Sequence, residues 1–469
     1  MAGNTAEKWQ GGLLGWVDAR FPLSSMWNEH LARYYAPKNF NFWYFFGSLA
    51  LLVLVIQLVT GIFLTMFYKP DAELAFASVE YIMRDVEWGW LIRYMHSTGA
   101  SMFFVVVYLH MFRAMLYGSY KQPRELIWVI GVLIYVVLMA EAFAGYLLPW
   151  GQMSYWGAQV IVNLFATIPV IGPDLVTWIR GDFLLSDATL NRFFALHVVA
   201  LPIVLLGLVV VHIIALHEVG SNNPDGVEIK KVKDENGIPK DGIPFHPYYT
   251  VKDLVGVGVF MIIFFAIVFF APEMGGKFLK ADNFIPANPL VTPELIPPVW
   301  YFTSFYSVLR SVPDPFLGVV AMGLAVVVLF FVPWLDRNPV KSMRYRSAAA
   351  RLNLAVFVVA FVVLGWAGLQ QATSLITEIS LRFSTVYFAF FFMLWFLSKE
   401  RSLGFSAIAF GGIVAVYTLY DLFRIGGTDP SLVVSWWFVP TVYLFAVMIV
   451  PALVKSLSHD KPVPERVTA

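Results

Sequence analysis

Ten apolar stretches, each close to the length that crosses a lipid bilayer, recur along this chain of 469 residues. The hydrocarbon core of a bilayer is about 30 Å thick, and a helix needs about 20 mainly apolar residues to span it. Because such a helix pairs its own backbone groups, it can cross lipid where an open sheet or loop cannot. The stretches predict an all-α polytopic membrane protein, with spans at 43–67, 90–117, 127–148, 193–216, 254–271, 316–335, 354–369, 383–397, 405–422 and 434–454.

The composition agrees with this prediction and limits the chemistry of the chain. Hydrophobic residues make up 59% of the sequence and charged residues 13%, against about 45–50% and about 25% in soluble domains. A soluble fold is therefore excluded. The net charge of +1 provides no basic field, so no nucleic-acid partner is expected. Since the chain has no cysteine, metal chemistry must use His or carboxylates, and thioether-linked haem is excluded.

The charges between the stretches predict the orientation of the chain in the membrane. Two connections are basic, whereas the first is acidic: Lys230, Lys231, Lys233 and Lys240 lie in one, Arg337, Lys341, Arg344, Arg346 and Arg351 in another, and Asp71, Glu73, Glu80, Asp85 and Glu87 in the first. By the positive-inside rule, both termini are expected in the cytoplasm. No removable signal peptide is visible, so the first span is expected to direct insertion.

Two of the predicted spans each contain a pair of histidines. His96 and His110 lie on the second span, and His197 and His212 on the fourth. The members of each pair are separated by about four helical turns, so each pair faces nearly one side of its helix, with its members about 21 to 22 Å apart. Both helices are expected to run from outside to inside. His96 is therefore expected to face His197 near the outer surface, and His110 to face His212 near the inner surface.

Four intramembrane histidines in this arrangement favour metal ligation over a structural role, which is the common reading of a single buried histidine. Four glycines on the first and third spans repeat at the same spacing as His96 and His110: Gly47, Gly61, Gly131 and Gly145. Helix packing explains any one of them, but a flat macrocycle inside a four-helix bundle also needs close backbone approach at each metal. We therefore predict two noncovalent b-type haems with axial histidines.

Arg93 and Arg113 each lie three residues from one of these histidines. Each is placed to neutralise the propionates of a haem. For Arg113, a topology charge at the inner surface is the alternative interpretation.

Several segments around these residues match a known family closely. They are WLIRYMH at 90–96, AGYLLPWGQMS at 144–154, RFFALH at 192–197, HEVGSNNP at 217–224 and FHPYY at 245–249. Over about two thirds of its length, from Trp16 to Leu335, the chain resembles cytochrome b, the dihaem core subunit of the cytochrome bc complex, a quinol:cytochrome c oxidoreductase. The end of the chain also resembles bacterial members, which implies location in a bacterial inner membrane.

The resemblance implies an enzyme with two quinone sites. Quinol is oxidised at an outer site near the haem of His96 and His197, and quinone is reduced at an inner site near the haem of His110 and His212. One electron of each quinol passes to a Rieske-type iron-sulfur protein and on to a membrane-anchored c-type cytochrome. The other crosses the membrane through the two haems, and the cycle translocates protons. A homodimeric complex is implied.

The resemblance also implies residue roles. The outer pocket is expected to be lined by Gly157, Gln159, Trp300 and Tyr301, and the inner site to use His217 and Asp253, with Lys252 nearby. A helix C-terminus that favours a positive charge is the alternative reading of His217.

Three departures from the family pattern stand out. The family usually has Pro-Glu-Trp-Tyr where this chain has Val299 between Pro298 and Trp300, so the expected proton-accepting glutamate is missing. Glu294 is the nearest carboxylate in the sequence and is our candidate for that role, with a solvent-exposed charge as the alternative. The histidines of the fourth span are one residue further apart than in mitochondrial members of the family. In this spacing the chain resembles the photosynthetic relatives. The last two predicted spans have no counterpart in the family.

Five regions follow from this interpretation. They are an interfacial amphipathic segment at 1–42, the dihaem four-helix bundle at 43–224, an inner connecting loop at 225–251, a C-terminal membrane region at 252–398 and the extra spans with a tail at 399–469. The mixed charges of 225–241 predict a solvated loop. The connections 153–170 and 289–310 are too apolar for plain loops and must be buried or line a cavity, and 289–310 is expected to belong to the outer quinol pocket.

Two other functions remain open from the sequence alone. A dihaem membrane anchor of a dehydrogenase also uses intramembrane histidine pairs, usually with fewer spans. A transporter without redox chemistry is supported only by the number of spans and by their Pro and Gly breaks.

Overall fold

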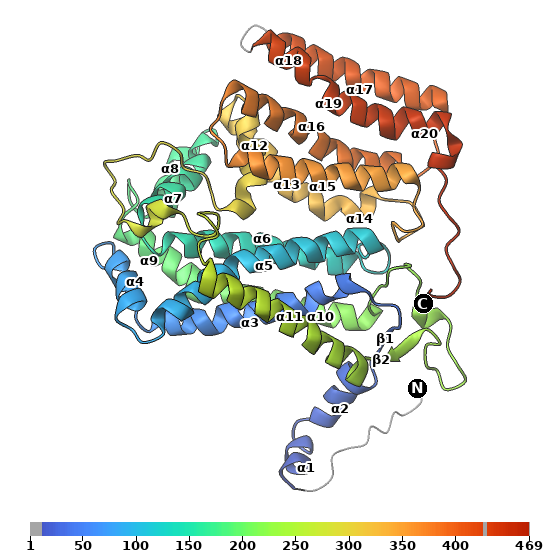
Figure 1. Ribbon diagram of the computed structural model, residues 1–469, viewed down its shortest axis with the longest axis horizontal. Helices are drawn as coiled ribbons and strands as arrows, with labels where there is room; N and C mark the ends of the chain where they lie inside the picture. The colour runs from blue at the N-terminus through green and yellow to red at the C-terminus, as the bar shows by residue number, and fades with distance from the viewer. Residues whose placement is uncertain (1–11, 425–428, 469) are drawn as a thin grey trace.

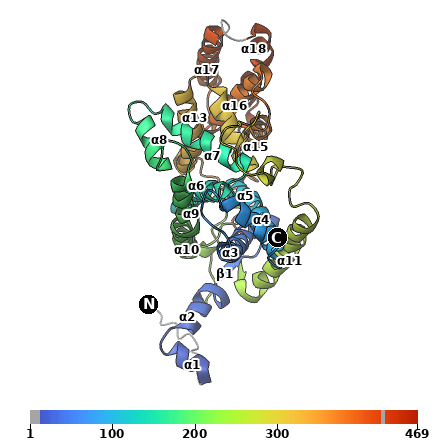
Figure 2. The ribbon, with the colours of Figure 1, turned by 90° about the vertical axis from the view of Figure 1, so that its left-hand side faces the viewer.

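The computed structural model describes residues 12–424 and 429–468. Within these ranges, ten helical segments are long and apolar enough to cross a membrane, which confirms the all-α polytopic prediction. Their bounds are Phe42–Thr65, Gly89–Tyr117, Glu125–Leu147, Asp187–Val219, Phe245–Phe270, Pro315–Leu335, Ala348–Gly368, Ser374–Phe396, Leu403–Arg424 and Pro430–Leu453. Most lie side by side in stacked layers (Figures 1 and 2).

Four of these segments form a bundle. They are α3 (Phe45–Thr65), α5 (Gly89–Tyr117), α6 (Glu125–Leu147), and α9 (Asp187–Ala195) continued by α10 (Leu201–Val219). Helix α3 packs along α5, and α10 packs along α6. Buried apolar side chains of α3, α5 and α6, among them Val53, Phe104 and Val132, fill the space between the helices. The bundle thus brings the second and fourth spans, which contain the histidines, to face each other.

A single turn of π-helix at Leu196–Ala200 joins α9 to α10 and contains His197. Such a turn takes up one extra residue inside an α-helix. His197 and His212 are one residue further apart in the sequence than His96 and His110, and the π-helical turn absorbs this residue. Both pairs therefore keep the same geometric relation along their spans, and the turn explains why the fourth span departs from the spacing of the second.

The remaining spans pack beside the bundle. They are α11 (Thr250–Phe270), α13 (Pro315–Val327) with α14 (Val332–Leu335), α15 (Ala348–Gly368) and α16 (Ser374–Phe396). Asp314, Ser347 and Thr373 cap the first turns of α13, α15 and α16 by accepting hydrogen bonds from backbone N–H groups.

The last two spans form a separate layer at the top of Figure 1. They are α17 (Leu403–Arg424) and the chain of α18 (Pro430–Trp436), α19 (Phe438–Leu444) and α20 (Val450–Leu453). Their buried face includes Leu444, Val447 and Met448, which pack in one cluster with Ala360 of α15 and Met393 of α16.

The eighth span begins at Ser374, well before the predicted start at Phe383, because its charged side chains are paired inside the protein. Arg382 and Glu378 form an ion pair, and both are fully buried. Arg382 also contacts Asp421 at 2.6 Å, and Arg424 contacts Glu378 at 2.5 Å. Charges at membrane depth are costly unless they are paired. This cluster fixes the extra layer to α16.

The two apolar connections contain helices. Residues 153–170 fall largely in α7 (Gln152–Leu164), and 289–310 include much of α12 (Thr303–Ser311). With α4 (Ala75–Arg84) and α8 (Gly172–Arg180), α7 lies at the left of Figure 1. This is the end that the charge pattern places outside, and we call it the predicted outer end.

At the opposite end, which we call the predicted inner end, the loop at 225–241 is exposed over residues 230–237, as its mixed charges predicted, but its two ends are buried. Asp225 and Asp241 are 1% and 3% exposed. Glu228 lies 2.5 Å from both Arg124 and Lys341. Burial opposes ionisation of Glu228, but hydrogen bonds from Arg124 and Lys341 outweigh it and lower its pKa to about 2. The prediction was right for residues 230–237 and wrong for these acids near the two ends of the loop, because basic side chains from distant segments pair with them.

The C-terminal tail packs against this loop at the predicted inner end. Arg466 pairs with Asp241 at 2.8 Å, and the backbone N–H of Thr468 donates a hydrogen bond to Asp225 at 2.7 Å. Nearby, β1 (Tyr35–Pro37) pairs antiparallel with β2 (Gly242–Pro244).

The N-terminal region stands away from the bundle (Figure 2). It contains α1 (Gly12–Asp18) and α2 (Leu23–Trp27). Leu13 and Trp16 are 76% and 57% exposed. Residues 1–11 of the predicted interfacial segment lie outside the described residues.

Candidate functional site

The structure brings the four histidines together in two facing pairs. The ring centres of His96 and His197 are 6.1 Å apart, and those of His110 and His212 are 6.4 Å apart. With metal–nitrogen bonds of about 2 Å, two imidazoles on opposite sides of one metal place their ring centres roughly 6 Å apart. Each pair therefore has the spacing for axial ligation of one iron. No group of three or more metal-binding side chains occurs in the described ranges.

The four glycines lie directly against these rings. A Cβ atom at Gly47 or Gly61 would lie 3.4 Å from Cε1 of His110 or His96, and one at Gly131 would lie 3.3 Å from Cε1 of His212. At Gly145 it would overlap the ring of His197. The absence of side chains here leaves room for the imidazoles and for a flat ligand between them.

Gly145 gives a direct test of this fit. We expect Gly145→Ala to displace His197 and to lower the content of the outer haem by at least half, because a ring that is bound to iron cannot move aside. Haem content and the absorbance spectrum of the purified protein measure the effect. Gly207→Ala is the matched control, since a Cβ atom there meets nothing within 4 Å. Equal haem content in both variants would contradict the prediction.

Arg93 and Arg113 fit the negatively charged edge of a haem. Arg93 lines the cavity that contains His96 and His197. Arg113 stacks on Tyr117 at 4.9 Å, and its Nε atom is buried and has no hydrogen-bond partner among the described residues. Neither arginine pairs with a carboxylate in the part of the chain that the structure describes. Both are therefore available to haem propionates.

The histidines at the predicted outer end have polar neighbours. Nδ1 of His96 and the hydroxyl of Thr60 form a hydrogen bond of 2.9 Å. Nδ1 of His197 lies 3.0 Å from the main-chain oxygen of Glu141 and 3.0 Å from its carboxylate oxygen Oε1. Sequence reasoning overlooked Glu141, although a carboxylate in the middle of an apolar span was a visible signal.

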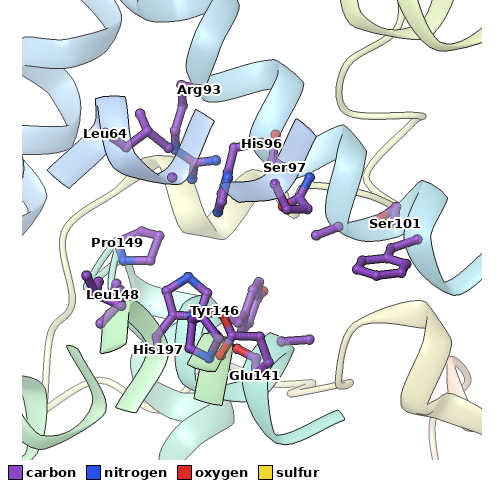
Figure 3. A pocket seen from close by; sticks show the side chains of 18 of the residues that line it. Leu64, Arg93, His96, Ser97, Ser101, Glu141, Tyr146, Leu148, Pro149 and His197 are labelled. Carbon is purple, nitrogen blue, oxygen red and sulfur yellow. Dashed lines mark hydrogen bonds and ion pairs between the residues drawn. The ribbon is translucent and has the colours of Figure 1, made fainter. Parts of the chain in front are cut away.

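A cavity of about 250 Å³ surrounds His96 and His197. Figure 3 shows the two rings on opposite sides of it, with Glu141 next to His197. Val299 and Tyr301 also line the cavity, so it extends to the segment that the sequence assigned to the outer quinol pocket. The ring of Tyr301 stacks on Phe104 with centres 3.9 Å apart.

Of the other predicted outer residues, Gly157 and Trp300 lie next to residues that line the cavity. The nearest atom to a Cβ at Gly157 is in the ring of Tyr146, at 3.8 Å, and Tyr146 lines the cavity. Trp300 donates a hydrogen bond of 3.2 Å to Ser101, which also lines it. The side-chain oxygen of Gln159 is buried without a hydrogen-bond partner in the described residues. Glu294 is exposed and is not part of the lining.

The residues predicted for the inner site lie at the predicted inner ends of two spans that follow each other in the sequence, His217 on α10 and Lys252 and Asp253 on α11. His217 stacks on Tyr34 with ring centres 4.8 Å apart. Asp253 accepts a hydrogen bond of 3.2 Å from Ser48. The Lys252 ammonium lies over the rings of Tyr44 and Tyr249, at 5.9 and 5.6 Å. Asp253 thus contacts Ser48 of α3, whereas His217 contacts Tyr34 of the N-terminal region.

Comparison with known proteins links this arrangement to one family. The family model "Cytochrome b/b6/petB" matches residues 31–220, and "Cytochrome b(C-terminal)/b6/petD" matches residues 286–388. Cytochrome b of Allochromatium vinosum is 64% identical over 83% of this chain and 95% of its own length. Cytochrome b of Rickettsia bellii is 50% identical over 81% of this chain and 92% of its own length.

A solved structure agrees. A chain of a hyperthermophilic respiratory Complex III superposes with a TM-score of 0.77 and 38% identity, over 82% of this chain and 98% of that chain.

Proposed function

Since this chain belongs to the cytochrome b family, we propose that it oxidises quinol near its predicted outer end and transfers one electron across the membrane to reduce quinone near its inner end. One observation carries the proposal. In each of two histidine pairs the rings face each other, with centres 6.1 and 6.4 Å apart, which is the spacing of two axial ligands of one iron. This arrangement suits two noncovalent b-type haems in series, one for each half of the bilayer.

The residues of the bundle would hold these groups. His96 and His197 would ligate one iron and His110 and His212 the other, while Arg93 and Arg113 would neutralise propionates. When bound, the haems supply one-electron carriers. The apolar helices around them exclude water, which strengthens the electrostatic contacts of the buried arginines.

At the outer site, Val299 and Tyr301 border the cavity, and Gly157 and Trp300 lie next to residues that line it. We assign Gln159 to the same pocket. We assign quinol binding to this region. One electron of each quinol goes to a Rieske-type iron-sulfur partner and then to a membrane-anchored c-type cytochrome, and the other enters the transmembrane path.

At the inner site, we assign His217 and Asp253 to hydrogen bonding and proton delivery to the quinone, with Lys252 beside them. Asp253 is half-buried and accepts a hydrogen bond from Ser48. Proton uptake here and release at the outer site would make the cycle translocate protons.

The assembly follows from the same proposal. The protein would lie in a bacterial inner membrane with both termini in the cytoplasm, within a dimeric complex. The extra layer of α17 to α20 lies beyond the last residue of the matching family models, residue 388, so it adds surface to this assembly that the family model does not describe.

Glu294 remains the candidate proton acceptor for quinol oxidation. We expect Glu294→Gln to slow quinol oxidation severalfold and to shift its pH dependence, because the amide keeps the shape but cannot act as a base. The measurement is steady-state turnover across pH with the iron-sulfur partner present. Because Glu294 is exposed, the function requires it to approach the cavity when that partner docks. Unchanged turnover at every pH would show that protons leave by another route.

The proposed function is tested on the purified membrane complex. We expect a reduced-minus-oxidised spectrum with two b-type haems per chain, and cofractionation with an iron-sulfur protein and a c-type cytochrome. A protein without haem would contradict the redox function. Two haems without those partners would instead indicate a membrane anchor of a dehydrogenase.

A further inference from the structure

Glu141 is a carboxylate at membrane depth for which the proposed function has no role. It lies within α6, a predicted span that runs from Glu125 to Leu147, and it lines the cavity of the outer histidine pair. A carboxylate in this position is costly and is retained in proteins mainly where it has a function.

The polar contacts of Glu141 described here are with His197. Oε1 lies 3.0 Å from Nδ1 of His197, and the main-chain oxygen of Glu141 accepts a hydrogen bond of 3.0 Å from the same nitrogen. The second carboxylate oxygen, Oε2, is buried and has no hydrogen-bond partner in the described residues. Across those residues, His197 is the one basic side chain within ion-pair distance of Glu141.

The other three histidines lack such a neighbour. Nδ1 of His96 has the neutral hydroxyl of Thr60 as its partner. The Nδ1 atoms of His110 and His212 are buried, and neither ring forms an ion pair with a carboxylate in residues 12–424 and 429–468. Among the residues that the structure describes, His197 is the only one of the four candidate ligands with a carboxylate within ion-pair distance of its ring.

We propose that Glu141 is a positioning residue that fixes the ring of His197 and tunes the outer haem through it. A carboxylate close to the distal nitrogen of a metal-bound imidazole orients the ring and makes it a stronger electron donor to the metal. It therefore stabilises the oxidised iron and lowers the reduction potential of the outer haem. A lower potential there favours onward transfer of the electron to the inner haem. This inference rests on the proposed function, because it requires a haem between His96 and His197.

The test is a redox titration of the two haems in the intact complex with Glu141→Gln, followed by their absorbance and by electron paramagnetic resonance. We expect the potential of the outer haem to rise by about 59 mV, which is a tenfold change in its one-electron equilibrium constant. Glu141→Leu, which also removes the hydrogen-bonding oxygens, is expected to shift it at least as far. The low-spin ferric signal of the outer haem is expected to change as well.

The inner haem provides the internal control, and its potential is expected to stay unchanged. Glu125→Gln, which removes a carboxylate at the other end of the same helix, is the matched control variant. Two haems with unchanged potentials in Glu141→Gln and Glu141→Leu would overturn the inference and leave the proposed function standing. An equal shift in the reduction potentials of both haems would also overturn it, since that result indicates an electrostatic effect that does not act through His197. Absence of haem from the unmodified protein would instead refute the proposed function.

Discussion

Replacing His197 with leucine is expected to abolish binding of the outer haem and, with it, essentially all quinol oxidation. The reason is the facing geometry of the rings: His96 alone would leave the iron with one axial ligand, and Leu offers no electron pair. The inner pair of His110 and His212 lies on the same two helical segments about four turns away, so its haem is expected to remain bound. A reduced-minus-oxidised spectrum of the purified variant measures both haems.

His459→Leu is the control for this experiment, because His459 is exposed in the C-terminal tail. It is expected to keep both haems and full turnover. A complete two-haem spectrum in His197→Leu would refute the pairing of His96 with His197. If both haems are lost, membrane insertion of the variant and its assembly with the partners show whether the protein is still folded.

Gly157→Trp is expected to reduce quinol oxidation at the outer site by at least tenfold, the second large effect. Gly157 lies on α7, and a Cβ atom there would already be 3.8 Å from the ring of Tyr146, which lines the outer cavity. An indole group at this position is expected to press on the ring of Tyr146 and so to narrow the cavity that this ring lines. Reduction of the inner haem by quinol is expected to continue, since the two proposed sites lie at opposite ends of the bundle. Stopped-flow haem reduction with each site blocked in turn distinguishes them.

A tryptophan elsewhere in the membrane region provides the control. A Cβ atom at Gly258 of α11 meets nothing within 4 Å, so Gly258→Trp is expected to leave both reactions near normal. Equal loss at both sites in Gly157→Trp would remove the outer-pocket assignment. Full activity at the outer site would show that Tyr146 shields the cavity from position 157.

The sequence by itself determined the membrane class, the number of spans and the identity of the histidine pairs. These features depend on quantities that are local to a segment: the length of an apolar stretch, and the number of residues between two side chains on one helix. The bilayer requires about 20 apolar residues per span wherever that span packs. Such properties can be predicted without knowing which helices are neighbours.

Only the tertiary structure decided which polar groups meet. The start of the eighth span was misplaced because Arg382 and Glu378 are acceptable inside the membrane only when Asp421 and Arg424 of a later helix pair with them. The π-helical turn at Leu196–Ala200 explains why His197 and His212 are one residue further apart than His96 and His110. The approach of Glu141 to His197, 56 residues away, and the exposure of Glu294 follow from how α6, α10 and the outer segments pack. Desolvation makes the energy of a charge depend on its neighbours in space, and the order of residues along the chain does not specify those neighbours.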